Sequence, residues 1–263
     1  MFRKFRILLL LLVLLVVAVG AWRAKVRVTS WENPIVAAVY PIAADTTPET
    51  TTFIQNLKPG DFAAIEQWLK AETERYGHRL HVPLRILLAP QVKAQPPQIP
   101  REGGVLKAIV WSLKMRWWAF RHDDLGARHA IRRPHLRLFL LYHAATPGKT
   151  LPHSTGLKEG QIGLVHVFAA PEQTAQNAVV VAHELLHTLG ATDKYDPRTL
   201  QPLYPEGYAE PERQPPLPQS LAEIMAGRIP LRPDRAEIPE NLDKTRIGRV
   251  TAIEIGLLKV GGN

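Results

Sequence analysis

Residues 179–193 constrain the fold most, because they combine an apolar helical pattern with side chains that bind metal ions. Valine and leucine supply the apolar faces, and Gly190 stands where a helix stop is expected. Side chains four residues apart lie one above the other on a helix. His183 and His187 can therefore direct two imidazole nitrogens at one metal ion.

Glu184 adds a third functional group to this segment. It follows His183 by one residue, about 100° around a helix, so it cannot share the ligand position but can reach a metal-bound water. The pattern predicts a zinc site with His183 and His187 as ligands and Glu184 as the general base. The alternative, two hydrogen-bonded core histidines, is costly on an apolar helix without a metal or polar partners.

The composition is typical of a globular protein, with 46% hydrophobic and 22% charged residues among 263. The formal net charge is +9, but six cations around one apolar segment supply +6 of it, which leaves +3 for the rest. We therefore expect no nucleic-acid partner. The absence of cysteine excludes disulfides and thiolate metal sites but leaves an oxidising compartment possible.

The apolar segment covers residues 7–22 and is bracketed by those six cations: Arg3, Lys4, Arg6, Arg23, Lys25 and Arg27. Its length lies between a signal-peptide core and a full membrane span. We expect residues 1–27 to form a signal anchor, a single pass in a bacterial-type inner membrane with the catalytic domain periplasmic or extracellular. A signal peptide cleaved near Gly20, which also exports the chain, and a buried core helix are the alternatives.

The order of the remaining elements predicts an α+β fold in which the motif helix packs beneath a twisted mixed sheet. Residues 28–263 form the predicted domain, with a sheet-and-helix subdomain over 28–190 and an irregular, Pro-rich C-terminal subdomain over 191–263. The expected strands are 34–42, 82–88, 136–142 and 163–169, and the expected helices are 62–76, 106–121, 220–226 and 251–258.

The helix expected at 106–121 has two apolar stripes. The first is expected to face the core, with basic residues on the flanks; packing on a membrane surface is a second possibility. The first stripe is Leu106, Ile109, Val110, Leu113, Trp117 and Phe120, and the opposite one is Trp111, Met115 and Trp118.

Residues 183–193, HELLHTLGATD, resemble the metzincin zinc-protease signature HExxHxxGxxH, with Asp193 in place of the third histidine, as in the snapalysin type. Gly190 can take a positive φ and turn the chain back, so that Asp193 completes a three-ligand site. The resemblance implies a zincin-like fold and a methionine turn below the metal, which Met225 could supply.

A gluzincin-like assignment is the rival. Residues 221–226 resemble the glutamate-bearing helix that supplies the third ligand in that clan, including the anthrax lethal-factor type. Glu223 would then bind zinc, and Asp193 would orient a ligand histidine. Both carboxylates are acceptable zinc ligands, and the two assignments stay open.

These features predict a membrane-anchored zinc metallopeptidase that acts on peptides or proteins. An extended substrate is expected to pair with the strand at 163–169. The alternative is a zinc-site envelope protein that binds or scaffolds a partner without proteolysis, through the Trp111, Met115 and Trp118 stripe. The candidates for oxyanion stabilisation are Tyr195, Tyr204, Tyr208 and Arg228.

Overall fold

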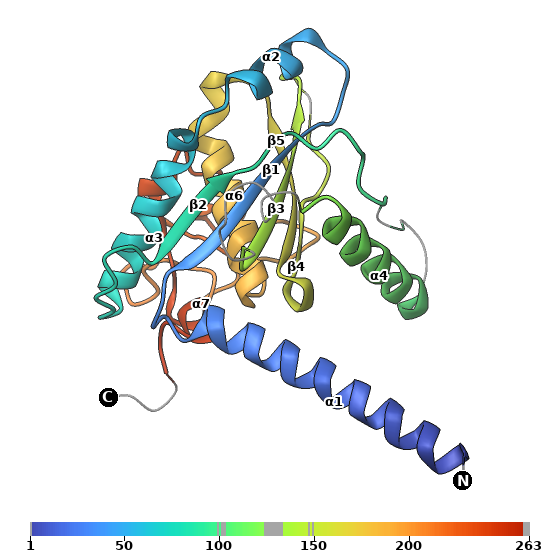
Figure 1. Cartoon of the computed structure of the whole chain (residues 1–263). Helices are drawn as coiled ribbons and strands as arrows, with labels where there is room; N and C mark the ends of the chain where they lie inside the picture. Colours follow the sequence, from blue (N-terminus) through green and yellow to red (C-terminus); the bar gives the residue numbers. More distant parts are fainter. Residues whose placement is uncertain are drawn as a thin grey trace.

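The computed structural model describes residues 2–98, 100, 104–123, 134–146, 148 and 150–259. Its centre is a five-stranded mixed sheet in the order β2-β1-β3-β5-β4 (Figure 1). β1, β2, β3 and β5 are parallel, and β4 pairs antiparallel with β5. The strands are β1 Ile35–Ala43, β2 Leu84–Leu88, β3 Leu136–His143, β4 Thr155–Leu157 and β5 Ile162–Phe168. The predicted α+β class with a mixed sheet is confirmed.

Helices cover both faces of the sheet, because the strands of its parallel part are apolar on both sides. One face packs against α2, α3 and α6 in the larger hydrophobic core, and the other packs against α4 in a second core. These helices are α2 Pro48–Asn56, α3 Ala63–Arg75, α4 Val105–Arg121 and α6 Thr174–Leu189. Short 3-10 turns occur at Pro59–Phe62, Lys158–Gly160, Pro171–Gln173 and Leu242–Lys244.

The C-terminal segment is mostly irregular, as expected, but it shares the larger core with the sheet. Ile224, Met225, Ile247 and Ile255 are buried in the same cluster as the strands and α6. The helix expected at 220–226 is wrong, because this stretch forms a strand and a turn. The elements are β6 Ala222–Glu223, β7 Ile229–Arg232, β8 Arg235–Glu237, β9 Thr245–Arg246 and α7 Arg249–Glu254, with β6 pairing β9 and β7 pairing β8.

The N-terminal helix α1, Phe2–Thr29, extends away from the body and joins it at its last turn (Figure 1). Val28 and Trp31 are buried there, and the Trp31 indole donates to the Ile255 carbonyl at 2.8 Å. In the described part of the chain, no helix has the length and apolar character required for a membrane span. The signal anchor therefore stays a prediction.

The orientation expected for α4 is wrong. Met115 and Trp118, expected opposite the core, are 0% and 8% exposed and pack against Phe139 and neighbouring strand residues. The stripe expected in the core faces solvent instead, with Leu113 and Trp117 58% and 64% exposed. Since both stripes are apolar, only the shape of the sheet surface decides which one is buried. Met115 and Trp118 therefore lie in the core and do not form an exposed surface in this fold.

Candidate metal centre

The end of α6 shapes the site. The helix stops at Gly190, which has φ +118°, and the Gly190 and Ala191 amides both donate to the Leu186 carbonyl at 3.0 Å. Any other residue at position 190 would hold a strained backbone conformation, and its Cβ would lie too close to the Lys158 side chain. The chain turns back as predicted, and this turn carries Asp193 to the two histidines.

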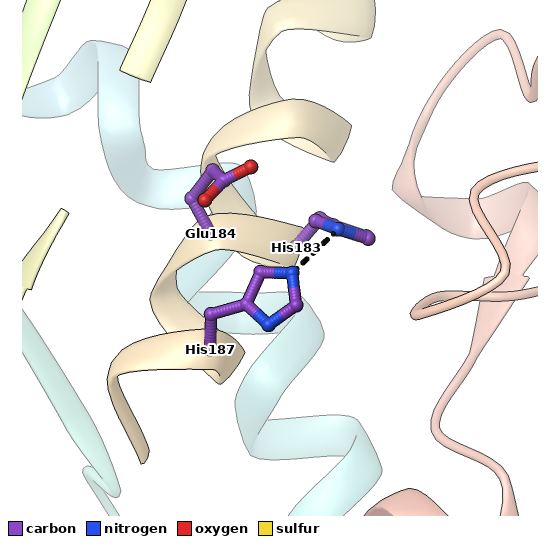
Figure 2. A group of neighbouring side chains, drawn as sticks. All are labelled: His183, Glu184 and His187. Atoms are coloured by element: carbon purple, nitrogen blue, oxygen red, sulfur yellow. Dashed lines mark hydrogen bonds between the residues drawn. The ribbon is translucent and has the colours of Figure 1, made fainter. Parts of the chain in front are cut away.

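Three potential ligand atoms converge beside α6. The Nε2 atoms of His183 and His187 are 3.0 Å apart, and Asp193 Oδ1 lies 3.2 Å from the first and 3.1 Å from the second. Figure 2 shows the two imidazoles, nearly perpendicular to each other and joined by a dashed line between ring nitrogens, with the Glu184 carboxylate on the same helix. Zinc bonds of about 2.0–2.1 Å hold tetrahedral ligands roughly 3.3 Å apart. The triangle formed by the three ligand atoms, with sides of 3.0–3.2 Å, is only slightly smaller than that.

The hydrogen bonds at the other ring nitrogens support metal binding. His183 Nδ1 donates to the Ile224 carbonyl at 2.9 Å, and His187 Nδ1 donates to the Ala191 carbonyl at 2.9 Å. A carbonyl only accepts, so in neutral imidazoles each Nε2 carries a lone pair. Two such lone pairs and the Asp193 carboxylate repel one another unless a cation lies between them. The donor set therefore fits a metal ion.

Glu184 is buried beside this triangle, at 5% exposure, and its Oε2 has no hydrogen-bond partner in the described structure. Burial raises the pKa of its carboxyl; nearby Asp193 acts in the same direction, and the imidazoles oppose the shift. An unpartnered buried oxygen normally requires an explanation, and a proton-transfer role supplies one. Glu184 also forms a geometrically possible metal-binding group with His183 and His187.

Asp193 is held as an acceptor. Burial alone would raise its pKa, but in the absence of a metal ion protonated His183 and His187 rings can donate to it through Nε2, and these contacts outweigh burial and hold the pKa well below its usual range. The loop that carries Asp193 is held in place by the next residue, Lys194, which is 3% exposed. Its ammonium group donates to both Glu254 carboxylate oxygens at 3.0 and 2.9 Å and to the Thr192 carbonyl at 2.8 Å.

Glu223, the rival ligand, is 0% exposed and its carboxylate is surrounded by donors. Oε2 accepts from the Met225 and Ala226 amides at 2.6 and 3.0 Å. Oε1 accepts from the Gly248 amide at 3.0 Å and the Thr251 hydroxyl at 2.7 Å. These four bonds tie together three parts of the C-terminal segment. The structure brings Asp193, and not Glu223, into contact with the histidines.

Met225, the candidate for the methionine turn, lies in a turn of the chain. The Ala226 amide donates to the Glu223 carbonyl at 3.0 Å, and Met225 is fully buried. The turn contacts the site through its backbone, since the Ile224 carbonyl accepts from His183 and the Met225 carbonyl accepts from the Lys194 amide at 3.0 Å. It therefore positions both a histidine and the loop that carries the carboxylate.

Of the four oxyanion candidates, Tyr195 lies nearest the site. Burial raises the pKa of its hydroxyl, and the negative charges of Asp193 and Glu184 raise it further. Tyr204 and Tyr208 instead pack edge to face, 5.1 Å apart, and in the described chain neither these two nor Arg228 has a hydrogen bond or ion pair with the histidines or acids of the site.

The sequence pattern gave no indication of His153. This exposed residue precedes β4, and its charge lowers the pKa of Glu184, which places the imidazole within electrostatic range of that carboxylate. It lies in a Gly/Pro-containing loop without periodicity, so no sequence signal singles it out.

A second strand, β4, lies beside the site next to the expected strand β5. β4 pairs with only the first three residues of β5, so in the described chain the part of β5 after Leu164 has no strand partner on that side. β4 crosses closely over the motif helix: a Cβ at Gly156 would overlap the His187 side chain and approach the Glu184 carbonyl at 3.2 Å. Within the described chain, the other edge of β4 is unpaired.

A cavity of about 1060 Å³ lies away from the three ligand atoms. It is lined by Phe53, Tyr142, Val167 and Ala178, among others, near the carboxyl ends of β3 and β5 and the amino-terminal half of α6. The size of a cavity therefore does not locate the candidate metal site of this protein.

In comparisons with known proteins, no family model matches the chain, and neither does any curated protein.

Proposed function

We propose that this chain is a zinc-dependent metallopeptidase of zincin-like fold, with His183, His187 and Asp193 as the zinc ligands. The observation that carries the proposal is the convergence of Nε2, Nε2 and Oδ1 within 3.2 Å, with both Nδ1 atoms donating elsewhere. Zinc, when bound, would polarise the scissile carbonyl and lower the pKa of its water.

Glu184 is the proposed general base. Its buried carboxylate has a raised pKa, which suits a group that accepts a proton from water and returns it to the leaving amine. Tyr195 is the proposed donor to the oxyanion, because its hydroxyl lies in the field of both Glu184 and Asp193. His153 is proposed to favour the ionised form of Glu184, because its electrostatic effect lowers the pKa of that carboxyl.

The proposed substrate is an extended peptide that pairs with the unpaired edge of β4. Main-chain hydrogen bonds to an edge strand recognise a peptide without requiring a particular sequence. The close packing of Gly156 on the motif helix supports this placement, because it holds the strand next to His187 and Glu184.

The proposed location is the outer side of a membrane, through α1 as a signal anchor, with cleavage near Gly20 as the alternative. The support comes from the apolar run at residues 7–22 and the cations on either side of it. The metal site does not depend on this proposal, because its residues lie in the folded body.

The substitution Glu184→Gln tests the reaction. It keeps the ligands, so zinc content by metal analysis should be unchanged, while peptide hydrolysis falls by about 10²–10⁴-fold. His183→Ala is the matched variant, which should lose both metal and activity. Full activity of Glu184→Gln, or full zinc content of His183→Ala, would refute the mechanism or the site. Zinc binding without turnover in the native chain would support the partner-binding alternative.

A further inference from the structure

The outer face of α4 carries an apolar stripe whose side chains are largely exposed in the described structure. Its exposed fractions run from 44% at Val110 to 79% at Val105. The α4 stripe consists of Val105, Leu106, Ile109, Val110, Leu113, Trp117 and Phe120. The spacing of three and four residues places most of them on one side of the helix. The surfaces of soluble monomeric proteins rarely expose so continuous a set of large apolar side chains.

The orientation of the stripe is fixed by packing on the other side of α4. Met115 and Ala119 are 0% and 1% exposed, and Trp118 packs edge to face on Phe139 with ring centroids 4.8 Å apart. The Trp111 indole donates to the Pro97 carbonyl at 3.0 Å. Rotating α4 about its axis to bury the stripe would break these contacts. The packing of α4 therefore keeps the stripe exposed.

The charged side chains of α4 itself are all positive. α4 contains Lys107, Lys114, Arg116 and Arg121 and no acidic residue. The Arg121 guanidinium lies over the Trp117 ring, 5.2 Å from its centroid, which places a cation at the border of the apolar surface. An apolar face flanked by lysine and arginine is complementary to the headgroups and acyl chains of an anionic lipid layer.

We propose that α4 is an interfacial helix that inserts the α4 stripe into the surface of an anionic lipid bilayer. A convex helix of 17 residues, about 26 Å long, exposes the stripe along its whole length, a shape that suits a lipid surface better than a shaped protein pocket. Tryptophan and basic residues are the side chains that such surfaces favour. The proposal depends neither on zinc nor on whether α1 spans the membrane.

This contact would orient the metal centre. α4 and α6 pack on opposite faces of the central sheet, in separate cores (Figure 1). A bilayer bound by α4 therefore leaves the α6 side, with His183 and His187, directed away from the lipid. The site would act on chains in the aqueous compartment instead of on segments within the membrane.

The chain contains no cysteine, so a single introduced thiol can report on the stripe in the full-length protein. Leu113→Cys, labelled with an environment-sensitive fluorophore, is the probe, and Leu203→Cys, at a similarly exposed position, is the matched control. With vesicles containing phosphatidylglycerol, the label at 113 should become protected from aqueous iodide and quenched by brominated acyl chains. The label at 203 should stay accessible, whatever α1 does.

The basic residues give a second test. Each lysine near an anionic surface is worth about 1 kcal/mol, or about a fivefold change in partition, so Lys107→Gln with Lys114→Gln should lower insertion of the label about 30-fold. Continued iodide access at position 113 would overturn the proposal. Equal insertion of the label into vesicles of phosphatidylcholine alone would also overturn it. So would protection of the label from iodide that rises with protein concentration in the absence of lipid, because that result would assign the α4 stripe to contact with a second copy of the chain.

Discussion

Substitution of Glu223 by glutamine separates a structural carboxylate from a zinc ligand. The Glu223 side chain accepts four hydrogen bonds inside the C-terminal segment and is fully buried. The amide oxygen of glutamine can keep two of these donors, but its NH₂ group faces the other two, the Gly248 amide and the Thr251 hydroxyl. Each donor left unsatisfied in the interior costs about 1–3 kcal/mol.

The expected loss for the two donors is therefore about 2–6 kcal/mol, which lowers the Tm of a domain of this size by roughly 5–25 °C. Thermal unfolding followed by circular dichroism measures the shift, and metal analysis of the folded protein measures zinc. Asp193→Asn is the matched variant, because that side chain is 43% exposed and should change Tm less while weakening zinc binding. Loss of zinc from Glu223→Gln at an unchanged Tm would refute this reasoning.

Three further substitutions test the surroundings of the site and the fold. Tyr195→Phe should lower kcat by about 10²-fold with zinc content unchanged; an unchanged kcat would remove the tyrosine from the mechanism. Lys194→Met removes the ion pair with Glu254 and should raise the zinc Kd about tenfold in a metal titration; an unchanged Kd would contradict a positioning role. Burial raises the pKa of Asp45, but hydrogen bonds from Ala144 and Thr47 outweigh it and lower the pKa to about 2. Stabilisation by Asp45 is thus present above the unfolded pKa near 3.9 and lost as pH falls from about 4 to about 2. After allowance for solvent screening it amounts to about 1 kcal/mol, so urea unfolding of Asp45→Asn should lack that part of the acid dependence.

The sequence was most informative where one local pattern decides the structure. The motif helix, its stop at Gly190 and the return of Asp193 follow from helix periodicity and from glycine's access to positive φ. The β-branched and leucine-rich runs also located β1, β2, β3 and β5 to within about two residues.

Features that depend on distant residues were beyond local patterns. Glu223 accepts hydrogen bonds from residues 25 and 28 positions further along the chain, so its structural role could not be separated from metal binding. The buried face of α4 is selected by complementary strand residues, since the helix is apolar on two sides. β4 has only three residues, too few for an alternating pattern.

The short helix α2 is not among the helices expected from periodicity, although its sequence carries a start signal. The Thr47 side chain accepts from the Thr50 amide, and Pro48 occupies the first turn. A capping threonine followed by proline is typical of a helix start. Periodicity does not predict this helix, because α2 has few apolar residues.

The central claim is that His183, His187 and Asp193 hold one zinc ion. Anomalous diffraction at the zinc edge from crystals of the zinc-loaded full chain tests it most directly. The proposal predicts a single peak about 2.0–2.2 Å from His183 Nε2, His187 Nε2 and an Asp193 oxygen, with Glu184 outside bonding distance. A peak bonded to Glu223, or no peak between the two histidines, would contradict it.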